Sequence, residues 1–348
     1  MDLLAGERPS PNCLRCGADV AGETIPDGAR MPACATCRAA LASLPAAVTE
    51  GTAEPTLGPV ACSTPFADFG VVAGLHVQLL AIERWPEHAA LYVAFNGPPG
   101  WLDVESGPLR GRVDVIGAEG VSVSGMTGSG GGSERLSIHE IALPSLNAVA
   151  GPWTIRLTRW GEYAEVSARP EDLRPLTALR AVVLEPVVPG PPEGLCMLCR
   201  TSPVGHRHAC DRCLGILTGI GQAYDSSTAM PLAHGQPLVH DIGDVGSGRL
   251  VLTALEQRDG WFSIRYHLAQ NWESHNGGYR GWWTAIDDAG NRFEGVEDHS
   301  DGDVTGWVGQ VSFPGCIDPT SRQLTLIVCA DGQTVLEVDL PLDATSTD

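Results

Sequence analysis

The sequence of 348 residues contains no lysine, so all 22 of its basic residues are arginines. This absence excludes a Schiff-base lysine, a lysine general base and the lysine of a phosphate-binding loop. The charge balance is also one-sided, because 42 Asp and Glu residues give a formal charge of −20. A surface of this sign repels phosphate backbones and disfavours nucleic acid as a partner.

Long apolar runs and targeting signals are missing as well. No stretch reaches the roughly 18 uninterrupted apolar residues of a membrane-spanning helix, and the nearest, residues 71–82, is broken by Gly74, His76 and Gln78. The N-terminus has no basic start followed by an apolar core. We therefore expect no membrane contact and a cytoplasmic location.

Catalytic signatures are absent from the sequence. There is no G-x-S-x-G nucleophile elbow and no G-x-x-x-x-G-K-[ST] loop. His139-Glu140 resembles the start of a zinc-protease H-E-x-x-H motif, but the fourth residue after His139 is Leu143. We interpret His139 as an ordinary strand residue and expect that the protein is not an enzyme.

The residues that are abundant favour short strands. The chain has 42 Gly and 26 Pro residues, 43% apolar residues and only 18% charged ones. Gly and Pro at this density interrupt helices and favour many turns. At this length, two or more folded units are expected. The composition thus predicts a mainly β protein with more than one core.

Eight of the eleven cysteines form four C-x-x-C pairs. The pairs fall into two matched sets, which are Cys13, Cys16, Cys34 and Cys37, and Cys196, Cys199, Cys210 and Cys213. Two such knuckles supply the four thiolates of a tetrahedral zinc site, and a site filled by sulfur has no open position for catalysis. We predict two structural Zn²⁺ ions. His206 and His208 are alternative ligands of the second site, and Cys62, Cys316 and Cys329 are expected to be buried.

An apolar stretch with helical character follows the second knuckle of each set, CRAALASLPAA and CLGILTGIGQAY. The order of knuckle, hairpin, knuckle and helix resembles the treble-clef or zinc-ribbon C4 modules of the ClpX type, over about 30 residues per copy. Because those modules dock and dimerise, the resemblance implies contacts with a protein partner. It does not extend to an ATPase, since the chain has no phosphate-binding loop, and the remaining β regions resemble no family that we recognise.

The chain carries an internal duplication. VQLLAIE at residues 77–83 matches LVLTALE at residues 250–256, and constant offsets of 170 to 173 pair many later glycines and apolar residues. Each copy alternates apolar and polar residues between turns, as strands with one buried face do. In the first copy we predict strands at 75–83, 90–95, 111–117, 120–125, 136–143, 153–159 and 163–168. Seven short strands are typical of an immunoglobulin-like β-sandwich.

These observations divide the chain into four modules and a spacer. The predicted ranges are C4 module 1 at 10–45, β-sandwich 1 at 66–185, a Pro-rich linker at 186–194, C4 module 2 at 195–225 and β-sandwich 2 at 238–343. Further linkers are predicted at 44–65 and 225–237. Because the Pro-rich linker should act as a semi-rigid spacer, we expect the two halves to move as units.

Three weaker signals favour ordinary structure. The Gly-rich run at 125–135 and its acidic counterpart at 295–306 are interpreted as loops between strands, although Asp298, Asp301 and Asp303 could gather a calcium ion. Three arginines in the second module could contact phosphates, but four thiolates and one Zn²⁺ add two negative charges there. These arginines are Arg200, Arg207 and Arg212.

An aromatic-rich segment at residues 271–283 is the best candidate for a ligand surface. Its rings belong to Trp272, Tyr279, Trp282 and Trp283. Exposed rings on a sandwich loop could stack on sugars or form a protein hot spot. The alternative is that Trp282 or Trp283 enters the core and the others cover it.

The sequence as a whole favours a non-enzymatic zinc-binding adaptor or scaffold that mediates protein contacts. One alternative is a zinc-dependent regulator that binds nucleic acid. Another is a β-sandwich protein that binds carbohydrate or peptide through the aromatic segment. The sequence itself names neither the partner nor the oligomeric state.

Overall fold

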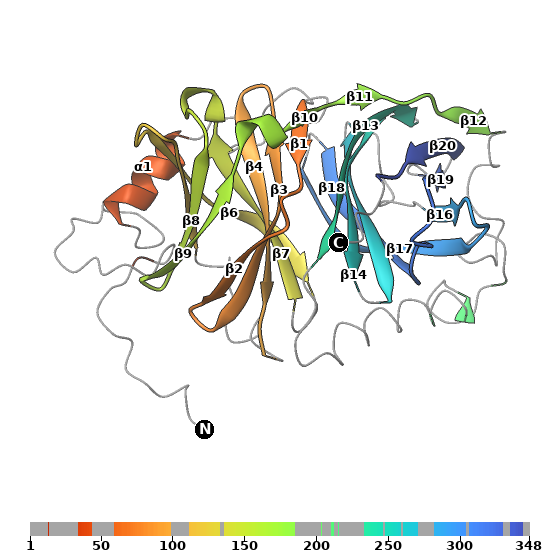
Figure 1. Cartoon of the computed structure of the whole chain (residues 1–348), viewed down its shortest axis with the longest axis horizontal. Coiled ribbons are helices and arrows are strands. Elements are labelled where there is room, and N and C mark those ends of the chain that lie inside the picture. The colour runs from red at the N-terminus through yellow and green to blue at the C-terminus, as the bar shows by residue number, and fades with distance from the viewer. Residues whose placement is uncertain are drawn as a thin grey trace.

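The chain is dominated by antiparallel β-structure in two curled sheets (Figure 1). The computed structural model describes residues 13, 34–43, 59–98, 111–132, 136–184, 203, 210, 211, 215, 233–245, 248–258, 260–270, 282–303, 306–329 and 335–343. Within these residues the α-helix that is described along its length is α1 (Ala35–Ser43), and two short 3₁₀ turns occur at Leu146–Ala148 and Pro170–Asp172. The predicted mainly β, sandwich-like class is confirmed.

The first sheet is built from the first half of the chain. Its strands are β1 (Ala61–Ser63), β2 (Ala67–Val72), β3 (Leu75–Arg84), β4 (His88–Asn96), β5 (Arg112–Ile116), β6 (Ser122–Gly132), β7 (Leu136–Pro144), β8 (Trp153–Arg159), β9 (Glu162–Ala168) and β10 (Arg174–Pro175). They are ordered β10-β1-β3-β4-β7-β6-β5-β8-β9, and β2 also pairs with β3. All seven strands predicted for this half are present, and β1, β2 and β10 were not predicted.

The second sheet contains ten strands. They are β11 (Thr177–Ala178), β12 (Val182–Leu184), β13 (His234–Val245), β14 (Gly248–Arg258), β15 (Trp261–Gln270), β16 (Trp282–Asp287), β17 (Arg292–Asp303), β18 (Gly306–Pro314), β19 (Gln323–Cys329) and β20 (Val335–Pro341). Their order is β11-β13-β14-β15-β18-β17-β16-β19-β20-β12. The predicted hairpin at 287–293 joins β16 to β17.

The two sheets repeat one strand order. The path β3-β4-β7-β6-β5-β8-β9 of the first half corresponds, strand by strand, to β14-β15-β18-β17-β16-β19-β20 of the second. In an immunoglobulin sandwich the strands form two separate sheets. Here each half forms one continuous hydrogen-bonded path, so the resemblance to immunoglobulin domains holds for the class and not for the strand order.

Each sheet curls around its own apolar core. In the first half, β2 lies against β9, and β8 alternates strictly between buried and half-buried residues. Inward-facing residues of β3, β4, β7 and β8 fill this core, with Leu79, Leu91, Ile141 and Leu157 all fully buried. An equivalent cluster fills the second half.

The segment that follows β9 joins the two sheets. β10 pairs with β1 of the first sheet, whereas β11 pairs in parallel with β13 and β12 pairs antiparallel with β20. The range predicted as β-sandwich 1, residues 66–185, therefore ends with strands that belong to the second sheet.

A third apolar cluster lies between the halves. It is made by the outer faces of β3, β4 and β7 on one side and by β13, β15 and β18 on the other. Its members are Cys62, Leu80, Ala81, Ala90, Tyr92, Ala94, Leu136, Ile138, Ala233, Val239 and Trp261. This shared core was not expected, and it favours two halves that are held together. The Pro-rich linker itself, residues 186–194, lies outside the described residues.

Both segments predicted as long loops are largely strands. Residues 122–132 form β6 and residues 292–303 form β17, which pair with β7 and β18. Tertiary pairing has overridden the turn-like composition of these stretches. The predicted linkers at 44–65 and 225–237 likewise contain β1 and the start of β13. No helix within the described part of the chain has the length and apolar character to cross a membrane.

Candidate metal centre

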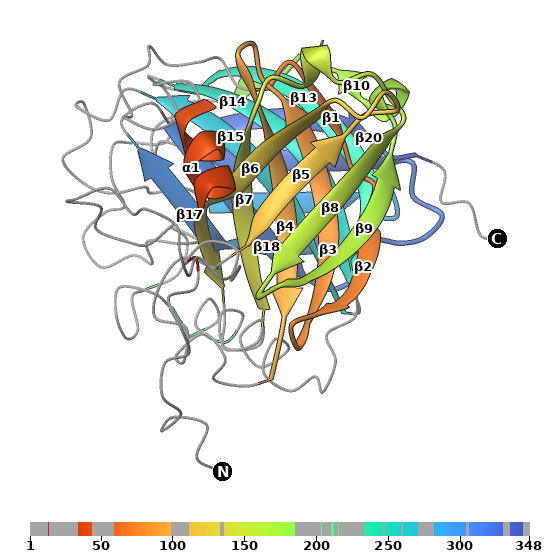
Figure 2. The same cartoon turned by 90° about the vertical axis from the view of Figure 1, so that its left-hand side faces the viewer.

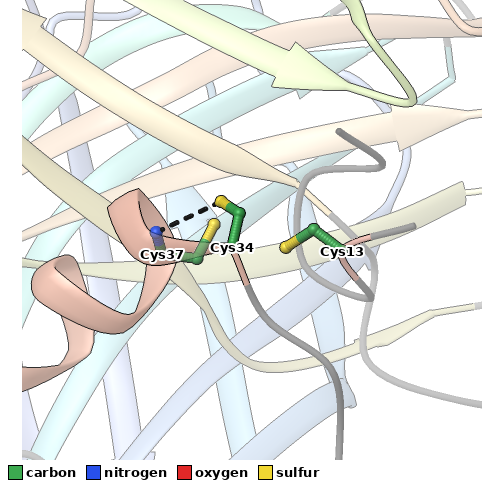
Figure 3. Close-up of side chains that lie close together, drawn as sticks. All are labelled: Cys13, Cys34 and Cys37. Atoms are coloured by element: carbon green, nitrogen blue, oxygen red, sulfur yellow. Dashed lines mark hydrogen bonds between the residues drawn. The ribbon is translucent and has the colours of Figure 1, made fainter. Parts of the chain in front are cut away.

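Three of the predicted zinc ligands lie together. The Sγ atoms of Cys13, Cys34 and Cys37 are all within 4.8 Å of one another, and the three side chains are buried (Figure 3). At a Zn–S bond of about 2.3 Å, two ligands of one tetrahedral zinc are separated by roughly 3.8 Å. The three sulfurs therefore need only a small adjustment to bind one metal ion.

The start of α1 positions two of these cysteines. Cys34 immediately precedes the helix, and Cys37 lies in its first turn. The backbone N–H of Cys37 donates to Sγ of Cys34 over 3.4 Å, and that of Arg38 donates to the carbonyl of Cys34 over 2.9 Å. An N–H donor directed at a thiolate favours its charged form, which is the form that binds metal.

The helix that carries these cysteines rests on the first sheet. α1 packs against the Gly-rich strand β6, as Figure 2 shows. The predicted apolar helix after the second knuckle is thus present in the first module. Because β6 has several glycines, the helix can approach its backbone closely.

The remaining predicted ligands are mostly outside the described residues. Cys16 is outside them, as are Cys196, Cys199 and Cys213, and the alternative ligands His206 and His208. Cys210 is described and is buried, and Asp211 and Gly215 are helical. The fourth ligand of the first site and the whole second site therefore stay predictions.

Of the three cysteines outside the C-x-x-C pairs, Cys62 and Cys316 have different surroundings, and the side chain of Cys329 lies outside the described part of the chain. Cys62 is fully buried, as predicted, and burial raises the pKa of its thiol, with a further increase from Glu83 and an opposing decrease from Arg265. Cys316 is exposed, which corrects the prediction for that residue. It lies in the connection between β18 and β19.

Trp283, one of the four aromatic residues predicted to form a ligand surface, does not lie on the surface. This side chain is buried in the core of the second half, where its ring centroid lies 5.1 Å from that of Tyr266. Trp283 is therefore removed from the surface, in agreement with the alternative that one of the two neighbouring tryptophans enters the core. Trp272 and Tyr279 lie outside the described residues. For Trp282 the structure describes the backbone, at the start of β16.

Two of the weaker sequence signals belong to ordinary strands. His139 is a buried residue of β7 whose Nε2 lies 2.6 Å from Oγ of Ser137, as expected for an ordinary strand residue. Asp298, Asp301 and Asp303 belong to β17 rather than to a loop. The arginines that suggested phosphate contacts, Arg200, Arg207 and Arg212, lie outside the described residues.

A buried charged cluster between the halves was not predicted. Nε2 of His267 on β15 donates to Oε2 of Glu83 on β3 over 2.8 Å, and both side chains are almost completely buried. In the second half, Glu256 accepts from Arg265 and lies 3.6 Å from Nη2 of Arg258. The Arg265 guanidinium also lies 4.2 Å from the centre of the Tyr92 ring in the other half.

These neighbours decide the charge of Glu83. Burial by itself raises the pKa of this carboxyl, but His267 lowers it through its charge and its hydrogen bond, and Arg265 lowers it further. The net result is a pKa below the ordinary value, so Glu83 is a carboxylate at neutral pH. A sequence signal existed, since the last residue of VQLLAIE and of LVLTALE is Glu83 and Glu256, respectively.

Comparisons with known proteins add little to this picture. The sequence matches no family model and no curated protein sequence. Among solved structures, the chain is similar to a conserved domain protein from Bacillus anthracis, at 8% identity over 77% of each chain with a TM-score of 0.23. A similarity of this size carries no argument about fold or function.

Proposed function

We propose that the protein is a non-enzymatic scaffold for protein contacts, stabilised by two structural Zn²⁺ ions. Cys13, Cys16, Cys34 and Cys37 would hold the first ion, and Cys196, Cys199, Cys210 and Cys213 the second. A bound zinc ion would neutralise part of the thiolate charge and fix the fold of each short module. The observation that carries this proposal is the cluster of three buried sulfurs at the start of α1.

A scaffold is favoured over an enzyme by the chemistry of the site. A zinc ion held by four thiolates has no open coordination position for water or substrate. The surroundings also suit a structural role, because α1 connects the cysteines directly to strand β6. A module fixed in this way would present its outer surface in a constant orientation relative to the first sheet.

The test is a measurement of zinc content. The purified chain should contain two Zn²⁺ ions, with X-ray absorption fine structure dominated by sulfur. The double variant Cys34→Ser/Cys37→Ser should contain one, because one knuckle of the first site is removed. Cys316→Ser is the matched control, since it removes an exposed cysteine from another part of the chain, and it should keep two. Equal zinc content in the double variant and the wild type would contradict the assignment.

A further inference from the structure

Equivalent residues of the two halves meet in the contact between them. Tyr92 pairs with Ala81 across β3 and β4, and Arg265 pairs with Ala254 across β14 and β15. Ala81 and Ala254 are the fifth residues of the matching runs VQLLAIE and LVLTALE. Tyr92 and Arg265 therefore hold the same position in the two copies, and the Arg265 guanidinium lies 4.2 Å from the centre of the Tyr92 ring.

The strands around this point repeat the same relation. β6 contacts β17, its own counterpart, and β1 contacts β13, whose first residues are the counterpart of β1. The halves lie side by side in Figure 1, and both use the same outer face for their contact. A contact in which each partner presents the same patch is typical of a dimer with a twofold axis. Here Tyr92 and Arg265 lie at the position of that axis.

Both copies keep an unfavourable backbone conformation at this contact. Phe66 and Val239 are equivalent, because each directly precedes the residue that pairs with the third residue of its matching run. Their φ values are 43° and 44°, in the left-handed region that bulky and β-branched residues rarely adopt. Val239 is buried in the cluster between the halves, and Phe66 packs against that cluster. Such strain persists only where the surrounding structure holds it, and in both copies this surrounding is the contact.

The chemistry of the contact is not symmetrical. At four equivalent positions the first half has the less polar residue and the second half has the more polar one, and all eight side chains are buried. The pairs are Leu80 and Thr253, Ala90 and Ser263, Tyr92 and Arg265, and Ala94 and His267. The two faces are therefore equivalent in position but complementary in polarity.

This difference disfavours a contact between like halves. If the face of the second half met a copy of itself in the same way, Arg265 would lie against Arg265, and two buried cations would repel each other. If the face of the first half met a copy of itself, Glu83 would be buried opposite Ala94. It would then lack His267, which donates to Glu83 over 2.8 Å. A buried carboxylate without its partner is strongly destabilising.

We propose that the protein is a fused dimer, in which each half binds the other as a subunit does and accepts only the unlike half. The binding surface of the first half is the outer face of β3, β4 and β7, and the partner that fits it is a half of the second type. This inference goes beyond the proposed scaffold function and does not rest on it, because no residue involved belongs to a zinc module.

The test exchanges the two residues at the axis in the full chain. Tyr92→Arg imitates a contact between two second halves and should lower the urea midpoint, because it places two arginines in contact. Arg265→Tyr should also lower it, because Glu256 loses a hydrogen-bond donor. The double variant Tyr92→Arg/Arg265→Tyr restores one ring and one cation in reversed order, with the arginine beside Glu140 on the neighbouring strand. It should regain at least half of the midpoint that Tyr92→Arg loses.

Arg156 and Tyr163 provide the matched control. They form a similar pair away from the contact, with the guanidinium 5.1 Å from the ring centre, and Tyr163 is 64% exposed. Tyr163→Arg should change the urea midpoint little, because exposed arginines stay hydrated. A fall as large as that of Tyr92→Arg would overturn the proposal, since the loss would then come from the substitution and not from the contact.

The double variant decides the question of equivalence. If it is no more stable than Tyr92→Arg, the proposal is overturned, because residues related by a twofold axis tolerate exchange. If Tyr92→Arg is unfolded without urea, a folded double variant supports the proposal and an unfolded one overturns it.

Discussion

Glu83 and Glu256 occupy equivalent places in the repeat but have different partners. Glu83 accepts a hydrogen bond from His267 of the other half, whereas Glu256 accepts from Arg265 of its own half. Both carboxylates are buried. A buried ion pair adds little stability compared with apolar residues, but removal of one partner leaves an uncompensated charge. Of the two, the pair of Glu83 and His267 is the one that links the two sheets.

The first prediction concerns the charge of Glu83. Glu83→Gln should lower the free energy of unfolding by about 3 kcal/mol, since His267 and Arg265 lose the carboxylate that compensates them. Urea denaturation at pH 7 measures this. The matched control is Glu165→Gln, which removes the carboxylate of a pair with Arg156 that is about 40% exposed on either side and should cost below about 1 kcal/mol. Similar losses in the two variants would mean that burial does not strengthen the Glu83 pair.

The second prediction concerns His88, which stacks on Trp85 with ring centroids 5.2 Å apart. Burial lowers the pKa of its imidazole from 6.5 to about 4; the charge of Glu83 opposes this decrease, and the charge of His267 adds to it. The unfolded chain therefore binds a proton between pH 6.5 and 4 that the folded chain does not. Stability is complete above pH 6.5 and falls as the pH decreases through this window.

Between pH 7 and pH 5 this histidine should account for a loss of about 1 to 2 kcal/mol, because its ring is partly exposed. Urea midpoints measured at pH 7, 6 and 5 give the loss. In His88→Asn the dependence on pH should be smaller by that amount. If the variant keeps the full wild-type dependence, His88 is not the group that titrates.

Among the secondary structure elements, alternation in the sequence predicted the strands of the first half closely. β8 was predicted at its observed residues, because one of its faces is in the core and the other is half-buried. β3 and β4 are different, since they are buried on both faces along almost their whole length. Their nearly continuous apolar sequences are typical of strands covered on both sides. The contact between the halves was therefore visible in the sequence as a pattern, although its partner was not.

Other elements could not be predicted, for identifiable physical reasons. β6 and β17 carry Gly-rich and acidic stretches that favour turns locally, and only pairing with β7 and β18 makes them strands. The cysteine pairs were predicted from spacing, because zinc requires a fixed set of ligands. The left-handed backbone of Trp160 was not predicted, since it is a property of the folded chain.

The third prediction tests what holds α1 in place. The short helix has no acidic residue in its first turn and no basic residue in its last, so it lacks these stabilising charges. If zinc supplies the missing stability, Cys34→Ser should abolish amide-exchange protection across residues 35–43. Protection in β3 and β14 should persist, because their cores do not include the cysteines. Retained protection of α1 in this variant would show that packing on β6 is sufficient without metal, and Cys316→Ser serves as the control.

For the whole molecule, the two halves close their sheets in different ways. In the first half, β2 lies directly against β9. In the second half, β11 pairs with β13 and β12 pairs with β20, so the segment at residues 177–184 reaches both ends of that sheet. This segment follows β10 of the first sheet directly in the sequence. Residues from the end of the first half therefore complete the second sheet. The side chain of Gln78 also exchanges two hydrogen bonds with the backbone of Ala233, at 2.7 and 2.9 Å, across the same contact.

The fourth prediction is that the halves unfold together. Leu80 is fully buried in the cluster between the sheets and does not belong to either internal core. In the wild type, the slowest amides of β8 and β19, which are strands outside that cluster, should exchange with the same free energy of opening, because one cooperative transition exposes both. Leu80→Asp places a charge in the shared cluster and should separate the two values, with each internal core still formed.

Val121→Asp, at an exposed site, should leave them equal. Different free energies of opening in the wild type would mean that the two halves unfold separately, although their side chains are in contact.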